Sequence, residues 1–119
     1  MEIIKRYARR NAKTWSLLET QTTIFEYALA NKMAKYIRDE TNNLDGLNDK
    51  TSMIKKADLF GISRKTIGKL FDKLFELGVI RSHNSEWVFN PYLSTDGNKV
   101  DKEIVELFND TFYAKMGTW

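Results

Sequence analysis

The sequence predicts a mainly α-helical domain with one small β-hairpin, an α+β fold. Apolar residues recur at helical spacing in several stretches that begin with a capping residue, and two short β-prone segments with a polar turn between them follow a glycine. The chain has 119 residues, of which 42% are hydrophobic and 13% aromatic, so we expect one domain with its own core. This composition argues against a disordered chain, which is typically low in hydrophobicity and high in net charge.

A helix is predicted over residues 24–40. Thr23 is a plausible N-cap with Glu26 three residues later, which is the capping-box pattern, and Phe25, Leu29 and Met33 follow at helical spacing. Ahead of this helix, the segment KTWSLLE (13–19) is expected to be a short strand or an extended arm. After it, TNNLDGLND (41–49) is rich in Asn, Asp and Gly and predicts a loop.

Two further helices are predicted on either side of Gly61. The first covers residues 51–60, and Gly61 ends it because glycine readily adopts the positive φ found at helix C-termini. Ser63 is the expected N-cap of the second, which runs over 64–77 and ends at Gly78. The apolar positions of this second helix predict that one side is buried: Ile67, Leu70, Phe71, Leu74 and Leu77.

Strands are predicted over 79–81 and 86–89, joined by a turn at 83–85, with Pro91 ending the hairpin. Two short helices joined by a tight glycine turn form a helix-turn-helix. Five positions agree with that pattern: Ala57, Gly61, Ile62, Ile67 and Leu70. A hairpin after the second helix predicts a winged helix-turn-helix.

The chain is expected to end in an extra helix over residues 100–116. Its apolar residues exceed what a small domain must bury, so we expect it to form a homodimer, with packing on its own domain as the alternative: Ile104, Leu107, Phe108 and Phe112. The predicted division is a basic N-terminal arm (1–19), the winged helix-turn-helix domain (20–97) and this C-terminal helix (98–119). The arm, basic from Lys5 to Lys13, is interpreted either as lying along DNA or as a disordered tail.

Positive charge is concentrated around the predicted helix-turn-helix. Residues 50–81 contain eight Lys or Arg against three acids, whereas residues 82–119 contain three Lys against six acids. This distribution is typical of a surface that meets phosphates, with a solvated lysine-rich face as the alternative. The second helix would place its N-terminal half in the major groove of DNA, and the hairpin would reach a neighbouring groove or phosphates.

The residues predicted to contact DNA lie on the outer face of that helix and on the hairpin: Ser63, Arg64, Lys65, Thr66, Gly68, Lys69, Lys73, Arg81, His83 and Asn84. Arg64 and Lys65 can donate to guanine or to phosphate, while Lys69 and Lys73 are expected on phosphates. Gly68 lacks a side chain on the outward face, which would allow another backbone to come close.

The segments GISRKTIGKLFDKLFELGVIRS (61–82) and WVFNPYLSTDG (87–97) resemble the winged-helix domains of RepL-like plasmid replication initiators of Firmicutes and their phage relatives. The first segment is also similar to MarR-like regulators. The resemblance, over residues 23–97, implies sequence-specific binding of double-stranded DNA for replication initiation or transcriptional control. The polar stretch NNLDGLNDKTSM (42–53) departs from the family, so the short strand usually found there is expected to be missing or very short.

Other classes of function find little support in the residues. There is no cysteine, and we find no nucleophile–base pair, paired-carboxylate cluster, phosphate-binding glycine loop or metal-ligand spacing. We therefore expect no enzyme activity, no metal and no small-molecule cofactor. No apolar run is long enough to span a membrane and no signal peptide is recognised, so we expect a cytoplasmic protein. A winged helix that binds only other proteins remains the alternative.

Overall fold

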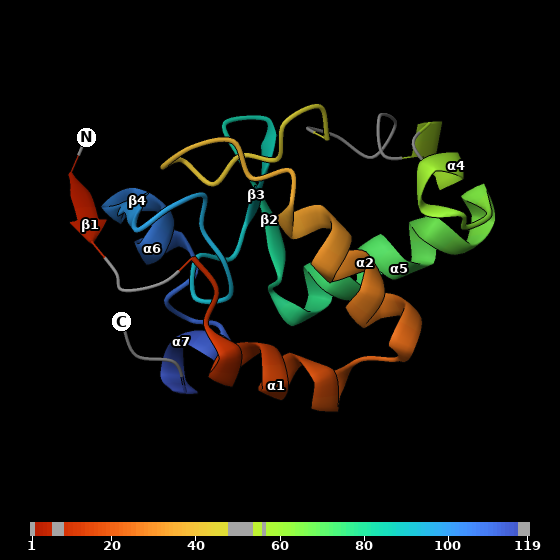
Figure 1. The fold of residues 1–119 in the computed structure, drawn as a ribbon, viewed down its shortest axis with the longest axis horizontal. Coiled ribbons are helices and arrows are strands. Elements are labelled where there is room, and N and C mark those ends of the chain that lie inside the picture. The colour runs from red at the N-terminus through yellow and green to blue at the C-terminus, as the bar shows by residue number, and fades with distance from the viewer. Residues whose placement is uncertain (1, 6–8, 48–53, 56, 117–119) are drawn as a thin grey trace.

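The computed structural model describes residues 2–5, 9–47, 54–55 and 57–116, which form a compact α+β fold with two small antiparallel sheets (Figure 1). The elements, in chain order, are β1 (Ile3–Lys5), α1 (Ala12–Gln21), α2 (Ile24–Ala34), α4 (Ala57–Phe60), α5 (Arg64–Leu77), β2 (Ile80–His83), β3 (Glu86–Phe89), β4 (Lys99–Asp101), α6 (Lys102–Leu107) and α7 (Phe112–Met116). Among the described helices, none combines the length and the apolar character that a membrane span requires.

Helix α1 occupies the segment that was predicted to be a short strand or an extended arm, so that prediction is wrong. Asn11 begins the helix, because its side chain accepts hydrogen bonds from the backbone N–H groups of Lys13 (3.0 Å) and Thr14 (3.3 Å). Trp15 and Leu18, three residues apart, are buried on the same side. The basic N-terminal segment therefore contains β1 and part of a packed helix rather than only an arm.

Helix α2 begins as predicted and ends earlier than predicted. Thr23 and Glu26 form the expected capping box. The helix stops at Ala34 instead of residue 40, since Ile37 pairs with Leu44 across a reversal of the chain and is buried there. The contacts that Ile37 makes in the folded chain therefore override the helical pattern of the local sequence.

The turn between α4 and α5 has the geometry that the sequence predicted. Gly61 lies in the left-handed region (φ 68°), Ile62 N–H donates to the Ala57 carbonyl (3.2 Å), and Gly61 N–H donates to the Asp58 carbonyl (3.2 Å). These two bonds are those of a Schellman motif. Ser63 then caps α5, which has the predicted bounds. The predicted start of the preceding helix, residues 51–53, lies outside the described residues.

The hairpin of β2 and β3 follows α5 directly. Its two-residue turn consists of Asn84 and Ser85, both with positive φ (52° and 64°), which matches the twist of an antiparallel hairpin. His83 belongs to β2 and pairs with Glu86, so the predicted three-residue turn is one residue too long and β2 is shifted from its predicted bounds. A single bridge between Asn43 and Val88 adds one residue to this sheet, where a strand was expected to be missing or very short.

The predicted single C-terminal helix is wrong: the segment forms β4, α6 and α7. In a continuous helix the carbonyl of Leu107 would accept from the N–H of Thr111. Here Arg81 Nη1 donates to that carbonyl (2.6 Å), and Thr111 N–H donates to Phe108 instead (3.1 Å). Ile104 and Phe108 are buried within the same chain, so they are not available as the dimer surface that the sequence suggested.

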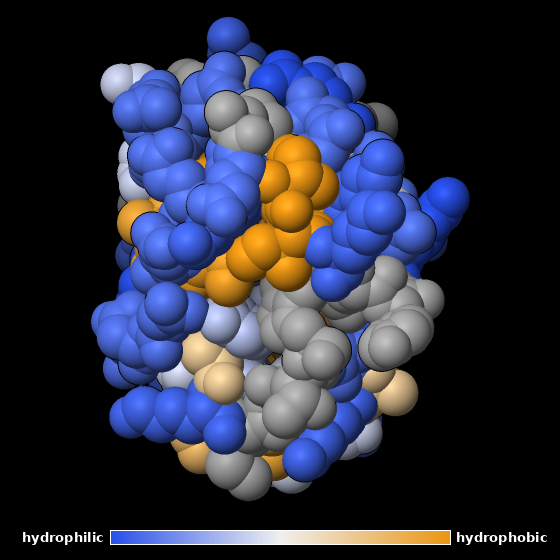
Figure 2. Space-filling view, turned by 90° about the vertical axis from the view of Figure 1, so that its left-hand side faces the viewer, coloured by the Kyte–Doolittle hydropathy of each residue, from blue (hydrophilic) through white to orange (hydrophobic). Residues whose placement is uncertain are grey.

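Two groups of buried side chains hold these elements together. The larger one lies between α1, α2, α5 and the hairpin, where Trp15 stacks on Phe89 (6.0 Å between ring centroids) and Trp87 meets the edges of Phe71 and Phe75. The smaller one lies under α6. On the face that carries β1 and α6, a group of apolar residues has hydrophilic residues on two sides (Figure 2).

The sheet of β1 and β4 places two lysines directly opposite each other, Lys5 and Lys99, both exposed. Like charges at such a position are unfavourable, so Lys5→Glu is expected to raise the free energy of unfolding by about 0.5–1 kcal/mol. Lys5→Gln removes the repulsion without adding an attraction and should give about half of the gain. Urea unfolding at low and high salt measures both; a gain that does not shrink in high salt would contradict the electrostatic cause.

Burial raises the pKa of the Tyr113 hydroxyl to about 12, and this hydroxyl donates to Gln21 Oε1 (2.8 Å). A raised pKa in the folded state means that its contribution to stability is complete below pH 10 and is lost as the pH rises towards 12. Between pH 9 and 11 the wild type should therefore lose about 1.4 kcal/mol more unfolding free energy than Tyr113→Phe, which cannot ionise there. Urea unfolding at both pH values measures this, and equal losses would contradict it.

Candidate nucleic-acid interface

Helix α5 has one buried side and one exposed side, as predicted. Ile67, Phe71 and Leu74 are fully buried and Leu70 nearly so, and α2 packs against this side of the helix. On the opposite side Lys65 and Lys69 are exposed. Figure 1 shows α5 behind α2, with its N-terminal end next to α4 at one end of the molecule. The core therefore fixes which side chains of α5 face outward.

The first turn of α5 combines a cap with outward-facing hydroxyls. Ser63 Oγ accepts from the N–H of Thr66 (3.2 Å) and donates to Thr66 Oγ1 (2.9 Å). The Thr66 hydroxyl accepts from Ser63, so its own proton is left to donate elsewhere. Uncapped N–H groups at a helix N-terminus carry partial positive charge, which adds to that of the side chains.

Three cations follow on the exposed side: Arg64, Lys65 and Lys69. None of them forms an ion pair with a residue that the structure describes. The acids of α5, Asp72 and Glu76, come later in the helix, so the first six residues carry positive charge only. An anion that approaches this end meets exposed cationic hydrogen-bond donors.

Two of the hairpin residues predicted to contact DNA, Arg81 and His83, face their own chain, whereas the third, Asn84, lies at the tip. Arg81 and His83 are two residues apart and so face the same side of β2, towards the α6–α7 segment. The Arg81 guanidinium forms two hydrogen bonds to Asp110 (2.6 and 3.2 Å), which lower the pKa of that carboxyl, and His83 Nε2 lies 3.5 Å from Glu103 Oε1. Both side chains therefore lie against the α6–α7 segment of their own chain, and Arg81 is hydrogen-bonded to Asp110 there.

The other residues of the hairpin and of α5 that were predicted to contact DNA are exposed or half-buried. Asn84 is exposed at the tip of the hairpin, and Gly68 and Lys73 are half-buried on α5. Two exposed residues were missed in the sequence: Ser85, beside Asn84 at the tip, and Lys55, just ahead of α4. The excess of positive charge in residues 50–81 was the signal that could have identified Lys55.

Comparison with protein-family models, with curated proteins and with solved structures gave no match for this chain. Within the described parts of the chain, no three His, Cys, Asp or Glu side chains are grouped so that they could hold a metal ion. The chemistry available at the interface is therefore that of hydrogen-bond donors and positive charge on a helix.

Proposed function

We propose that this protein is a winged helix-turn-helix protein that binds double-stranded DNA in a sequence-specific way, as a transcriptional regulator or as a plasmid or phage replication initiator. The observation that carries the proposal is the N-terminal half of α5. There Arg64, Lys65 and Lys69 are exposed and form no ion pair with a described residue, while the other side of the helix is packed on the core.

The dimensions of α5 suit the major groove. Fourteen residues span about 21 Å at 1.5 Å per residue, and the groove of B-DNA is about 12 Å wide and accepts one helix. In this placement Arg64 and Lys65 reach base edges or phosphates, and Thr66 donates to a phosphate oxygen. Lys69 and Lys73 lie further along the helix, where they would meet phosphates of the DNA strands that flank the groove. Asn84 and Ser85 bring the tip of the hairpin to a neighbouring part of the duplex.

Fluorescence anisotropy with labelled duplex DNA at several salt concentrations tests the proposal. Three to four phosphate contacts give a slope of log K against log salt of about −3 to −4. Selection of bound sites from random duplexes then tests sequence specificity, and a palindromic consensus would support binding as a symmetric homodimer. The absence of any association at low salt would overturn DNA binding.

A protein-interaction module is the second candidate, and one surface favours it. Ile24 and Phe25, at the start of α2, have exposed fractions of 78% and 65%. Neighbouring exposed side chains of this size are unusual on a monomer and often mark a contact surface. This candidate predicts association with a protein but no salt-dependent affinity for duplex DNA, so the same titration separates the two.

A homodimer remains part of the proposal, with a surface that shares only Leu107 with the one first considered. Ile3 of β1 is exposed, and Ile4 and Leu107 beside the smaller core are half-buried. Sedimentation equilibrium with and without duplex DNA measures the association, and Ile3→Lys should weaken it if this face is used.

A further inference from the structure

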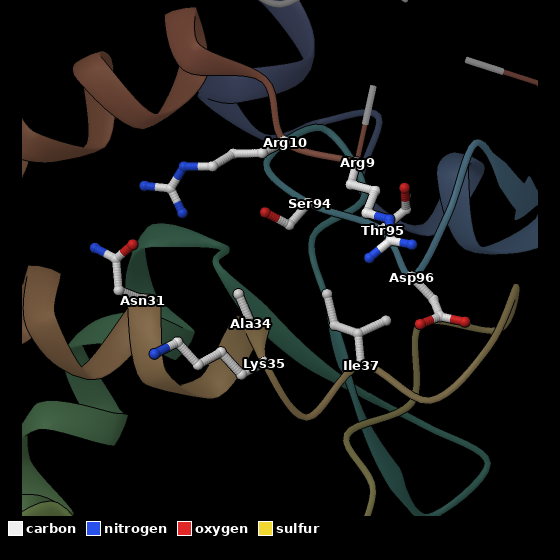
Figure 3. Close-up of a pocket in the computed structure, with 9 residues that line it drawn as sticks. All are labelled: Arg9, Arg10, Asn31, Ala34, Lys35, Ile37, Ser94, Thr95 and Asp96. Carbon is white, nitrogen blue, oxygen red and sulfur yellow. The ribbon is translucent and has the colours of Figure 1, made fainter. Parts of the chain in front are cut away.

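A pocket of about 260 Å³ lies between the N-terminal segment, α2 and the loop before β4 (Figure 3). Three cationic side chains line it, Arg9, Arg10 and Lys35, against one carboxylate, Asp96. In Figure 3 Arg9 and Arg10 lie on different sides of the pocket, and Lys35, at the end of α2, lies along a third side below Asn31. The lining therefore has an excess of two positive charges.

The Arg10 guanidinium is held in place by an aromatic ring. Its guanidinium carbon lies 3.8 Å from the centre of the Trp15 ring. That ring is fixed in turn, because Trp15 Nε1 donates to the Leu93 carbonyl (2.9 Å) and to Ser94 Oγ (3.0 Å). Stacking orients the guanidinium without using its N–H groups, so these donors remain for an anion.

Arg9 and Lys35 are exposed and form no ion pair with any residue in the described part of the chain. The backbone beside Arg9 is nevertheless ordered by the fold, since Thr95 N–H donates to the Arg9 carbonyl (2.8 Å). Three cations are thus positioned around one cavity, and no described acid is paired with them. Their shared positive potential favours an anion in the cavity.

We propose that this pocket binds a small molecule that carries a phosphate monoester group. Two guanidinium groups and one ammonium group match a dianion, and arginine is the side chain best suited to phosphate oxygens. Ser94 Oγ accepts from Trp15, which leaves its proton for a phosphate oxygen. Ala34 and Ile37 give one wall an apolar character for the organic part. The volume is below the roughly 300–1,000 Å³ of pockets for larger ligands, which favours a small one.

The pocket lies on the opposite side of α2 from α5. Asn31, Ala34 and Lys35 line the pocket, whereas Leu29 and Met33 are buried in the core that supports α5. A duplex held by α5 is therefore not the source of phosphate that this geometry favours, and we assign the site to a free ligand.

The test uses NMR spectra of the ¹⁵N-labelled full chain, titrated with inorganic phosphate and with phenyl phosphate, and with chloride at matched ionic strength. The Trp15 indole N–H and the amides of Lys35, Ser94 and Thr95 should shift and saturate with both phosphates, more tightly with phenyl phosphate. Arg9→Gln with Lys35→Gln should weaken binding by about tenfold or more, since each removes a charged contact. Lys13→Gln with Lys115→Gln, the same change of charge elsewhere, should alter it less than about twofold.

Three outcomes would overturn the proposal: shifts that do not saturate, equal shifts with chloride, or equal weakening by the control pair. The two pairs of variants are also titrated with duplex DNA. Suppose that Arg9→Gln with Lys35→Gln lost affinity for the duplex while neither phosphate compound bound. The phosphate recognised here would then belong to the DNA backbone, and the assignment to a small molecule would be wrong. Unchanged duplex affinity together with weakened phosphate binding supports it, whatever becomes of the proposed DNA-binding function.

Discussion

Reversal of two charges on α5, by Lys65→Glu together with Lys69→Glu, is expected to lower the affinity for duplex DNA by about 100-fold or more. Each lysine lost from a phosphate or base contact costs about 1–3 kcal/mol, and 1.4 kcal/mol corresponds to a factor of ten. The new carboxylates add repulsion from the phosphates. Because both side chains are exposed and form no described ion pair, the fold should keep its thermal midpoint.

The control for this variant has the same change in net charge at another place. Lys99→Glu with Lys115→Glu replaces exposed lysines of β4 and α7. If α5 is the DNA-binding element, the control should lose only the small part of the affinity that comes from long-range attraction. Anisotropy titrations at two salt concentrations compare the two variants. Equal losses in both would show that net charge, and not the position of α5, determines binding.

Single contacts are separated in the same assay. Arg64→Ala should weaken binding to the selected sequence more than to random duplexes if the guanidinium reads a base. If it touches only phosphate, the loss should be similar for both and the salt slope should flatten by about one. An unchanged affinity for Arg64→Ala and for Lys65→Ala would contradict the proposed orientation of α5.

The features predicted correctly from the sequence are those that neighbouring residues determine. Helix α5 has its predicted bounds because Ser63 caps it, Gly78 ends it and its apolar residues keep one period throughout. The same holds for the capping box of α2 and for the turn at Gly61. The outward placement of Lys65 and Lys69 follows from that period and needed no knowledge of the rest of the fold.

The features predicted wrongly depend on residues far apart in the chain. Helix α1 is held by Trp15, which donates to Leu93 and Ser94 almost eighty residues later. The C-terminal helix is interrupted because Arg81 donates to the Leu107 carbonyl, and this same contact holds the Arg81 side chain against the α6–α7 segment. Periodicity cannot reveal such competition for a backbone group, since both partners look ordinary in their local sequence.

Gly78→Ala is expected to lower the free energy of unfolding by about 3 kcal/mol. Gly78 joins α5 to the hairpin. Gly78 has a φ of 77°, which costs an L-residue about 1–2 kcal/mol. A Cβ atom there would lie 2.6 Å from Thr111 Cγ2, inside a buried cluster where overpacking typically costs about 1–3 kcal/mol. The two effects act together, and urea unfolding measures their sum.

Gly61→Ala separates the conformational cost from the cost of the clash. Gly61 has a similar φ of 68° but no heavy atom within 4 Å of the position that its Cβ would take. It should lose only the conformational part, about 1–2 kcal/mol. Thr111→Ser removes the clashing methyl group and keeps the hydroxyl, which donates to the Phe108 carbonyl (2.7 Å) and accepts from Asn90 (3.3 Å). Gly78→Ala combined with Thr111→Ser should therefore be more stable than the sum of the single effects by about 1 kcal/mol or more.

The comparison of the Gly78 and Thr111 variants also tests the position of α5 in the proposed interface. The Gly78 carbonyl accepts from Asn90 Nδ2 (2.9 Å), so the residue connects the end of α5 to the segment that follows β3 as well as to β2. A Cβ that pushes Thr111 aside would change the angle between α5 and the hairpin, and the double variant should restore duplex affinity together with stability. Equal losses at Gly61 and Gly78 without rescue would mean that Thr111 yields at little cost, and that the contact does not set the position of α5.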